Sequence, residues 1–427
     1  MRPLAIAEAP PGAASVATGL EPRAPVGLYV HVPFCVSLCP YCEFVVFTGR
    51  AARGPRSGVG AFLAAARVEL GLRADDLDAR FGPPGSPGRL PLSSLYFGGG
   101  TPSLLPAEEI AGLIDIVRGR FGLASDAEIT VEANPGPADR GNARGFVQAG
   151  ITRMSIGAQS FQQAELRVLG RRHRPGDVAE TVAEARSAGI ASLSLDLLYD
   201  VPGQTADSWA DSLRQALAAA PDHLSLYALA LGDPDREGLT GPLGDHLPTR
   251  RGAARWRSQA GALQDEDRAA AMYEHASERL AAAGWRGYEI SSWAQPGHEC
   301  RHNLAYWRRE PVAAVGPGAH SFDGISRHWN AALLGPYLEA LLPPSGRPAS
   351  LPPGGIEVVD TETAEAERVM LALRTDAGLP AADLDHLPLS RVAAWGTDLD
   401  LLWVAGERVA LTTRGRLLAD SLFERLF

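Results

Sequence analysis

The sequence contains no lysine, so all 40 of its Lys/Arg positions are arginine. This absence excludes mechanisms that depend on a lysine amine, such as a Schiff base, a pyridoxal phosphate linkage or the phosphate-binding lysine of a P-loop. No apolar run reaches the ~18 residues that a membrane-spanning helix needs. The formal net charge of −10 argues against nonspecific binding to nucleic acid.

Cysteine is also scarce, and its placement is informative. Of four cysteines, Cys35, Cys39 and Cys42 fall within eight residues, and Cys300 lies far away. Disulfides need an oxidising compartment, which nothing here indicates, and zinc sites usually show two C-x2-C pairs or a matching histidine pair. A C-x3-C-x2-C loop can instead turn three thiolates toward a [4Fe–4S] cluster, which leaves the fourth iron for an exchangeable ligand. We therefore predict Cys35, Cys39 and Cys42 as metal ligands.

The length of 427 residues favours two domains. Residues 1–25 are rich in Ala and Pro without a continuous apolar stretch, which predicts a disordered extension rather than a signal peptide and, with no targeting segment, a cytoplasmic protein. Residues 26–342 form the predicted main domain, and 343–355 a Pro/Gly-rich linker. Residues 356–427 are predicted to form a small α+β winged-helix-like domain, whose acidic balance favours a structural or lid role over DNA reading.

Short β-rich runs alternate with amphipathic helical patterns between residues 27 and 230. Such alternation predicts parallel strands with crossover helices, and without a dinucleotide fingerprint it favours an α/β fold, a partial (β/α)6 TIM-like barrel. Chemistry in such barrels gathers at the carboxyl ends of the strands. Residues 232–265 show no clear period and are predicted to be a surface loop. The strands are expected at 27–32, 93–97, 128–132, 153–156, 192–198 and 223–227.

Polar side chains and a glycine run recur at the ends of these strands. The second strand ends in Gly98-Gly99-Gly100, where the backbone can approach a ligand closely. Glu132, Gln159 and Asp196 stand at the ends of the third, fourth and fifth strands. Each alone is explained equally well by a helix cap or a loop hydrogen bond. Their common position at one end of successive strands favours a ligand site.

The cysteine spacing and the glycine run resemble the radical S-adenosylmethionine (SAM) superfamily, and the resemblance covers residues 29–427. It implies a [4Fe–4S] cluster and SAM as cofactors. A zwitterionic, ribose-bearing cation needs an acid for amino or hydroxyl groups, an arginine for its carboxylate and an amide for the ribose. The SAM-binding positions that the resemblance implies are Tyr29, Tyr41, Gly99, Gly100, Thr101, Glu132, Gln159, Arg171, Asp196 and, as a backbone contact, Ala230.

Two features indicate one branch of that superfamily. The GGGTP run is typical of oxygen-independent coproporphyrinogen III dehydrogenase and its relatives, but the true enzyme has another cysteine where this chain has Phe44. That departure resembles the HemW-type haem chaperones. The H-N-x-x-Y-W motif, here His302 to Trp307, is associated with haem binding in that group. We also note that Asp200 stands where relatives usually have glycine, which should alter that loop.

The resemblance implies His302 as an axial haem ligand, a role that histidine fills in other haem proteins. Tyr306 lies one helical turn further on and would share its face, with Trp307 beside it. A buried, hydrogen-bonded core histidine is the alternative. His320, in glycine-rich surroundings, and Cys300 are competing ligands.

The leading hypothesis is a haem chaperone that carries a SAM-ligated [4Fe–4S] cluster and transfers haem to an acceptor protein. The alternative is coproporphyrinogen III dehydrogenase, which carries out a radical SAM decarboxylation in porphyrin biosynthesis. A nucleic-acid-associated radical enzyme is a third, disfavoured by the acidic stretch 360–367. Expected partners are haem or porphyrin, the acceptor, and an electron donor such as flavodoxin or ferredoxin. We expect no nucleic acid and no transmembrane segment, and leave peripheral membrane association open.

Two further histidines complete the sequence predictions. His31 lies two residues after Tyr29 on the first strand, which puts both on one face, toward the barrel interior. His173 lies in an arginine-rich turn and is predicted to be solvated or close to the ribose rather than a metal ligand.

Overall fold

The first strand, β1 (Gly27–Val32), shows how the sequence separates a core face from an interior polar face. Leu28, Val30 and Val32 are fully buried and belong to the same apolar cluster as the residues of the first long helix. Tyr29 and His31 alternate with them and contact each other, with 3.1 Å between the Tyr29 hydroxyl and His31 Nδ1. The predicted shared face of Tyr29 and His31 is therefore confirmed.

The structure, a computed structural model, describes residues 21–51, 58–344, 346–385 and 389–426. The predicted N-terminal extension lies almost entirely outside these ranges. The six predicted strands are present, and neighbours pair in parallel in chain order. After β1 they are β2 (Leu92–Gly99), β3 (Leu123–Ala133), β4 (Arg153–Gln159), β5 (Ser192–Tyr199) and β6 (His223–Ala228).

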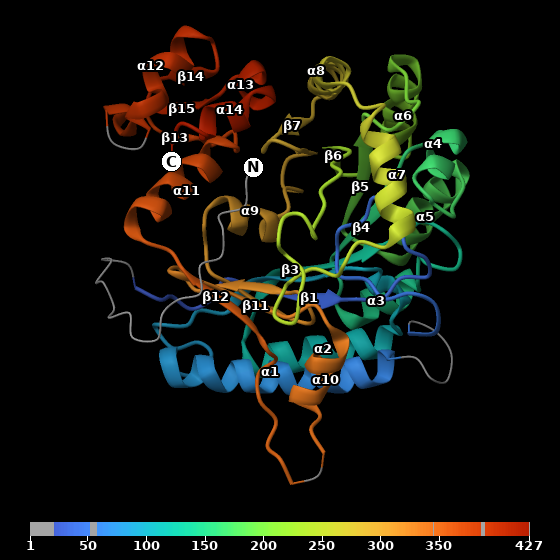
Figure 1. The fold of residues 1–427 in the computed structure, drawn as a ribbon, viewed down its shortest axis with the longest axis vertical. Coiled ribbons are helices and arrows are strands. Elements are labelled where there is room, and N and C mark those ends of the chain that lie inside the picture. The colour runs from blue at the N-terminus through green and yellow to red at the C-terminus, as the bar shows by residue number, and fades with distance from the viewer. Residues whose placement is uncertain (1–20, 52–57, 345, 386–388, 427) are drawn as a thin grey trace.

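Helices connect these strands and cover their apolar face. In Figure 1, α1 and α2 lie side by side below the strands, and α4 to α7 stand to the right. The α/β prediction is confirmed by this order. The connecting helices are α1 (Val59–Phe81), α2 (Ala107–Arg120), α3 (Ala143–Ala149), α4 (Gln163–Val168), α5 (Pro175–Ala188) and α6 (Ala206–Ala218), with short turns at Gly49–Ala51 and Pro102–Leu104.

The sheet is larger than the six predicted strands. Within the described residues it has 12 strands in the order β12-β11-β10-β9-β1-β2-β3-β4-β5-β6-β8-β7. On the β1 edge, β9 pairs in parallel and β10 to β12 follow antiparallel, while β8 and β7 extend the β6 edge antiparallel. The added strands are β7 (Arg286–Gly287), β8 (Ser292–Ala294), β9 (Val312–Val315), β10 (His320–Phe322), β11 (Ser326–Asn330) and β12 (Gly354–Val358).

The predicted boundary between the linker and the C-terminal domain falls inside β12. The first residues of this strand fall in the predicted linker, 343–355, and its last in the predicted C-terminal domain, yet the whole strand pairs with β11. The predicted boundary therefore cuts through a strand of the main sheet. Helix α10 (Leu334–Leu341) precedes it and packs against α1.

The segment 232–265 contains a helix that the sequence prediction missed. α7 (Arg251–Gly261) lies within it, followed by α8 (Glu266–Ala282). The buried residues of α7 are Arg257 and Ala260, so its inner face carries an arginine where a periodicity argument expects an apolar residue. The prediction of a surface loop without regular structure is wrong for these eleven residues.

The C-terminal residues form helices, a short strand and a hairpin, with an apolar cluster of their own. Their three strands lie in the order β13-β15-β14. No helix of the described residues combines the length and apolarity needed to cross a membrane. The elements are α11 (Thr361–Leu373), β13 (Leu379–Pro380), a turn at Ala381–Asp385, α12 (Ser390–Asp398), β14 (Leu402–Ala405), β15 (Arg408–Leu411), α13 (Thr413–Leu417) and α14 (Ala419–Phe423).

Candidate functional site

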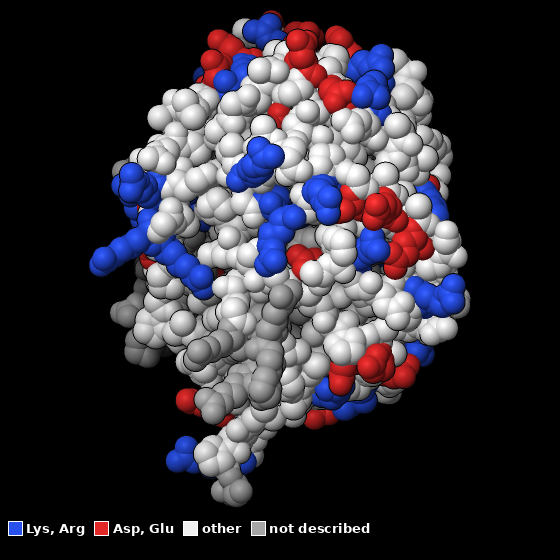
Figure 2. Space-filling model, turned by 90° about the vertical axis from the view of Figure 1, so that its right-hand side faces the viewer, with Lys and Arg blue, Asp and Glu red and all other residues white. Residues whose placement is uncertain are grey.

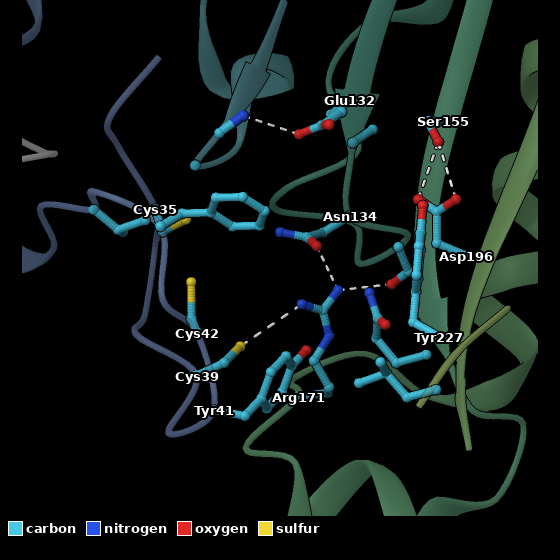
Figure 3. Close-up of a pocket in the computed structure, with 18 of the residues that line it drawn as sticks. Cys35, Cys39, Tyr41, Cys42, Glu132, Asn134, Ser155, Arg171, Asp196 and Tyr227 are labelled. Atoms are coloured by element: carbon cyan, nitrogen blue, oxygen red, sulfur yellow. Dashed lines mark hydrogen bonds between the residues drawn. The ribbon is translucent and has the colours of Figure 1, made fainter. Parts of the chain in front are cut away.

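A cavity of about 520 Å³ opens at the carboxyl ends of the parallel strands, between them and the cysteine loop. Its size is that of a small-molecule site. Figure 3 shows the loop on one side and the strand residues on the other, with the polar side chains pointing into the space between. The predicted residues that line it are Cys35, Cys39, Tyr41, Cys42, Gly99, Gly100, Glu132, Gln159, Arg171, Asp196 and Ala230.

The three cysteines of the loop are half-buried and free. Burial raises the pKa of the Cys35 thiol to about 11 and that of Cys42 to about 12. Within the described residues, no three His, Cys, Asp or Glu side chains are placed to hold a single metal ion. Three free thiols on one loop beside the cavity are a suitable ligand set for a [4Fe–4S] cluster whose fourth iron takes another ligand.

The glycine run at the end of β2 packs against the end of β1 and the start of the cysteine loop. Gly99 has φ +103°, and a Cβ there would lie 2.3 Å from the ring of His31. A Cβ on Gly100 would lie 2.7 Å from the carbonyl oxygens of Val32 and Phe34. Neither position can therefore carry a side chain without moving the first strand.

Thr101 acts on the loop rather than on the cavity. It is 1% exposed and is not among the lining residues. Its hydroxyl oxygen lies 3.1 Å from Cys35 Sγ and accepts a hydrogen bond of 3.0 Å from Asn134 Nδ2. Thr101 therefore holds Cys35 in place, while direct contact between Thr101 and SAM stays a prediction.

Glu132 is a half-buried acid that lines the cavity. One carboxylate oxygen accepts from the Gly99 amide at 3.0 Å, and the other accepts from the Tyr96 hydroxyl at 2.9 Å. Burial raises the pKa of Glu132 to about 7, assisted by the nearby charge of Asp196 and opposed by the two hydrogen bonds. A cation bound beside it would favour its ionised form.

Asp196 and Gln159 follow on the neighbouring strands. Burial also raises the pKa of Asp196, whose carboxylate accepts from the hydroxyls of Ser155 at 3.0 Å and Ser194 at 3.3 Å. Gln159 has φ +63°, a left-handed conformation that costs energy in a residue other than glycine. Strain of this kind at a cavity is typical of a functional site.

Arg171 brings a permanent positive charge to the cysteine side of the cavity. Its Nη1 lies 3.6 Å from Cys39 Sγ, and its Nη2 donates to the Gly157 carbonyl at 2.7 Å and to Asn134. Figure 3 shows the guanidinium between the cysteine loop and the strand ends. Acids at one end and a guanidinium at the other suit a zwitterionic ligand.

The sequence prediction missed the deeper lining of the cavity. Arg153 is 2% exposed and donates to the His298 carbonyl at 2.9 Å, and His223 hydrogen-bonds Ser194 and Tyr288. Arg153 shares its strand face with Gln159, as the two-residue period requires, so the same alternation could have identified it. The other missed lining residues include Tyr96, Asn134, Ser155, Ser225, Tyr227, His246 and Asn303.

Helix α9 (Arg301–Trp307) carries the predicted haem motif. His302 is 1% exposed, with Nδ1 2.9 Å from Ser94 Oγ, Nε2 3.1 Å from the Tyr306 hydroxyl and its ring stacked on Tyr96. Burial lowers the pKa of His302 to about 3, so the ring is neutral. In this structure His302 is thus a buried, hydrogen-bonded histidine, and its role as a haem ligand stays a prediction. The shared face of His302 and Tyr306 is confirmed.

The two ends of this segment reach different environments. Cys300, just before α9, is 2% exposed and lines the cavity, as does Asn303. Tyr306 is 43% exposed and Trp307 is half-buried. Tyr29 does not line the cavity, and its ring stacks on His302 with 6.3 Å between centroids.

His320 and His173, two further histidines named in the sequence analysis, have specific contacts in the structure. His320 is exposed, stacks on Trp329 and lies 2.8 Å from Asp245. His173 lines the cavity at 3% exposure, with Nε2 3.0 Å from the Ala158 carbonyl, so the solvated alternative is wrong.

Asp200, the predicted departure in its loop, adopts φ +57°. Its carboxylate accepts from Arg268 Nε at 2.9 Å. The loop therefore keeps a left-handed backbone that glycine would adopt freely, and an ion pair holds the aspartate there.

Comparison with known proteins identifies relatives of this chain. A model of the Radical SAM superfamily matches residues 86–216. A protein of Mycobacterium tuberculosis named heme chaperone HemW is 39% identical over 405 residues, which are 95% of this chain and 95% of that protein. The protein of the same name from Escherichia coli K12 is 35% identical over 328 residues, 74% of this chain and 78% of that one.

A solved structure shares the fold. The coproporphyrinogen III oxidase HemN of Escherichia coli, described as a radical SAM enzyme, matches with a TM-score of 0.74 over 96% of this chain and 91% of that chain. Its sequence identity is 23%, so this likeness concerns the fold alone.

Proposed function

We propose a function from the premise that this chain belongs to the family of the HemW haem chaperones, within the radical SAM superfamily. The chain binds haem, holds a SAM-ligated [4Fe–4S] cluster, and passes the haem to an acceptor protein. Family membership supports the first and last parts of this function, and the cavity supports the second.

The cluster is assigned to Cys35, Cys39 and Cys42, the three thiols of the loop beside the cavity. SAM is assigned to the lining that faces them. Glu132 and Asp196 supply half-buried acids, Arg171 supplies a guanidinium, and Gly99 and Gly100 contribute backbone to the cavity wall. The cluster and SAM together supply one-electron chemistry. The residues of this chain would bind and orient the two groups.

Haem is assigned to the neighbourhood of α9, with His302, Tyr306 and Trp307 as the predicted contacts. The observation that carries the proposal is the position of this segment. It lines the cluster cavity through Cys300 and Asn303 and reaches the surface through Tyr306. A haem bound against α9 would therefore lie next to the cavity, and the occupancy of the cavity could affect its release.

Haem titration of the anaerobically reconstituted protein tests this proposal. Wild type should develop a Soret band with saturable binding. His302→Ala should weaken the binding at least tenfold if His302 is the ligand, and Cys300→Ser and His320→Ala test the two competitors. His275→Ala, on α8, is the matched control and should bind haem like wild type. Wild type that fails to bind haem would overturn the proposal.

The alternative activity, decarboxylation of coproporphyrinogen III, is tested in the same preparation. Phe44 stands where that enzyme has a further cysteine, so we expect no decarboxylated product with SAM and a reductant. Product formation would show that the chain acts as an enzyme on that substrate.

A further inference from the structure

We propose that exposed arginines on both sides of the cysteine loop form a docking surface for a small acidic electron-carrier protein that reduces the cluster. This inference rests on the proposed function in one respect, the cluster at Cys35, Cys39 and Cys42. We call the surface the arginine rim. It consists of Arg167, Arg172, Arg174, Arg250, Arg251 and Arg255, all of them exposed.

The first side of the arginine rim is α7, which is attached directly to the cysteine loop. From its buried face, Arg257 donates to the carbonyl oxygens of Pro40 at 3.2 Å and Cys42 at 2.9 Å. Trp256 lies against Tyr41, with 6.4 Å between the ring centroids. A protein that docks on the exposed face of α7 is therefore separated from the loop by the thickness of one helix.

The second side is the turn between α4 and α5. It touches the same loop, because a Cβ on Gly170 would lie 2.9 Å from Pro40 Cδ. The next residue, Arg171, lies 3.6 Å from Cys39 Sγ. Arg172 lines the mouth of the cavity, and Arg174 follows it into solvent. The loop thus lies between two sets of exposed positive charges.

These charges are not held by ion pairs within the described part of the fold. Within the part of the chain that the structure describes, none of the six guanidinium groups forms an ion pair, whereas arginines elsewhere do, such as Arg268 with Asp200 and Arg186 with Asp222. Arg250 is the N-cap of α7 without a side-chain cap, and no acid stands in the first turn. Positive charge at a helix N-terminus is unfavourable. A residue that lowers local stability at an exposed position is typical of a functional surface.

An exposed aromatic side chain lies beside these charges. Phe44, two residues after Cys42, is 66% exposed, and it borders a shallow hollow together with Arg250 and Ala253. An exposed aromatic side chain next to an exposed arginine is typical of a protein–protein interface. A bilayer is a poorer fit, because one exposed ring gives only a weak anchor. Figure 2 shows the side of the molecule that lies at the right in Figure 1, where α4 to α7 are labelled, and basic side chains gather there at mid-height.

The chain has a net charge of −10, so a basic surface on it would orient an acidic partner toward the cluster. Small acidic flavin or iron–sulfur proteins have the required charge and redox chemistry. In the transfer, the carrier loses one electron and the cluster gains one, and no bond is formed or broken.

Binding of oxidised flavodoxin to the reconstituted protein tests the docking surface. We expect Arg251→Glu/Arg255→Glu to bind flavodoxin at least about tenfold more weakly than wild type at low salt, with the difference shrinking as salt rises. Phe44→Ala should also weaken binding. Arg279→Glu/Arg414→Glu, which reverses two exposed arginines of α8 and α13, is the matched control and should bind like wild type. Thermal unfolding of each variant checks that the fold is kept.

Reduction of the cluster provides a second readout. Dithionite, which needs no docking, should reduce the cluster equally fast in wild type and in Arg251→Glu/Arg255→Glu, while reduced flavodoxin should act more slowly on the variant. Equal flavodoxin affinity in the two proteins would overturn the docking surface and leave the proposed function intact. If the variant instead loses binding to phosphatidylglycerol vesicles and keeps flavodoxin binding, the arginine rim is a membrane surface and our inference is wrong. A chain that never loads a cluster would overturn both.

Discussion

SAM binding should release a proton from Glu132 near neutral pH. The pKa of this carboxyl is raised to about 7 by burial, so about half of the molecules carry a proton there at pH 7. SAM brings a sulfonium and an ammonium group into the cavity that Glu132 lines. A neighbouring positive charge favours the carboxylate and should drive its pKa well below 6.

The magnitude follows from the titration curve. Loss of the proton on binding predicts a release of about 0.9 proton per SAM at pH 6 and about 0.5 at pH 7. Because only the ionised form binds tightly, the affinity for SAM should rise about fivefold from pH 6 to pH 7 and about twofold from pH 7 to pH 8. Glu132→Gln should bind SAM more weakly, without this pH dependence.

Stability should change in the opposite direction with pH. The folded-state pKa of Glu132, about 7, lies above its ordinary value of 4.5, so the folded protein keeps a proton that the unfolded chain loses. The free energy of unfolding should therefore fall between pH 4.5 and pH 7, by up to about 3 kcal/mol, and level off above that. Glu132→Gln should remove this fall, and urea titrations at pH 5 and pH 8 measure it.

Calorimetry in two buffers of different ionisation enthalpy measures the proton release directly. The amine of SAM titrates above pH 7 in both proteins, so the difference between wild type and Glu132→Gln isolates the carboxyl. A release at pH 6 that is the same in both proteins, or absent from wild type, would refute the assignment of Glu132 as the acid beside the SAM cation.

Three further predictions follow from single contacts. Gln159→Gly should raise the free energy of unfolding by about 1 kcal/mol because it relieves the left-handed backbone, yet weaken SAM binding by about tenfold because the amide is lost; weaker SAM binding without a gain in stability would contradict the strain argument. Arg257→Met removes the donor to the cysteine loop and should lower stability by about 3 kcal/mol and reduce the iron bound per chain on anaerobic reconstitution; unchanged iron loading would show that α7 does not shape the loop. Asp200→Gly should be about 1 kcal/mol more stable than Asp200→Ala in urea titrations, because both lose the Arg268 ion pair but only alanine keeps the left-handed strain; equal stability would contradict this.

The central part of the fold could be predicted because each strand is bounded by turn residues and followed by an amphipathic helix. The short edge strands β7, β8 and β10 could not, since β7 has two residues and β8 and β10 have three, too few to show a period. Helix α7 could not be predicted for a different reason. Its buried face contains Arg257, whose guanidinium is satisfied by backbone carbonyls that only the folded cysteine loop provides.

The candidate site also contains residues that the sequence predicts and residues that it does not. Residues at the carboxyl ends of strands, such as Glu132 and Gln159, can be predicted because barrels gather chemistry there. Arg153 and His223 lie at the start of their strands and face the same interior, so only the alternation of side chains could have identified them. The sequence placed Thr101 in a SAM motif, but its contact with Cys35 depends on two segments 66 residues apart.

The burial and the hydrogen bonds of His302 limit how haem can reach its ring. A neutral imidazole is what haem iron requires, and burial supplies that form, since it lowers the pKa to about 3. Yet both ring nitrogens are already engaged, one by Ser94 and one by Tyr306. Replacing the Tyr306 hydrogen bond costs only about 1 kcal/mol, so the larger barrier is the movement needed to expose the ring. Because α9 has seven residues and is preceded by Cys300 in the cavity wall, such a movement would reshape the cluster site as well. If His302 ligates haem, haem binding and the cavity are therefore coupled through α9, whereas ligation by the exposed His320 would leave the cavity unchanged.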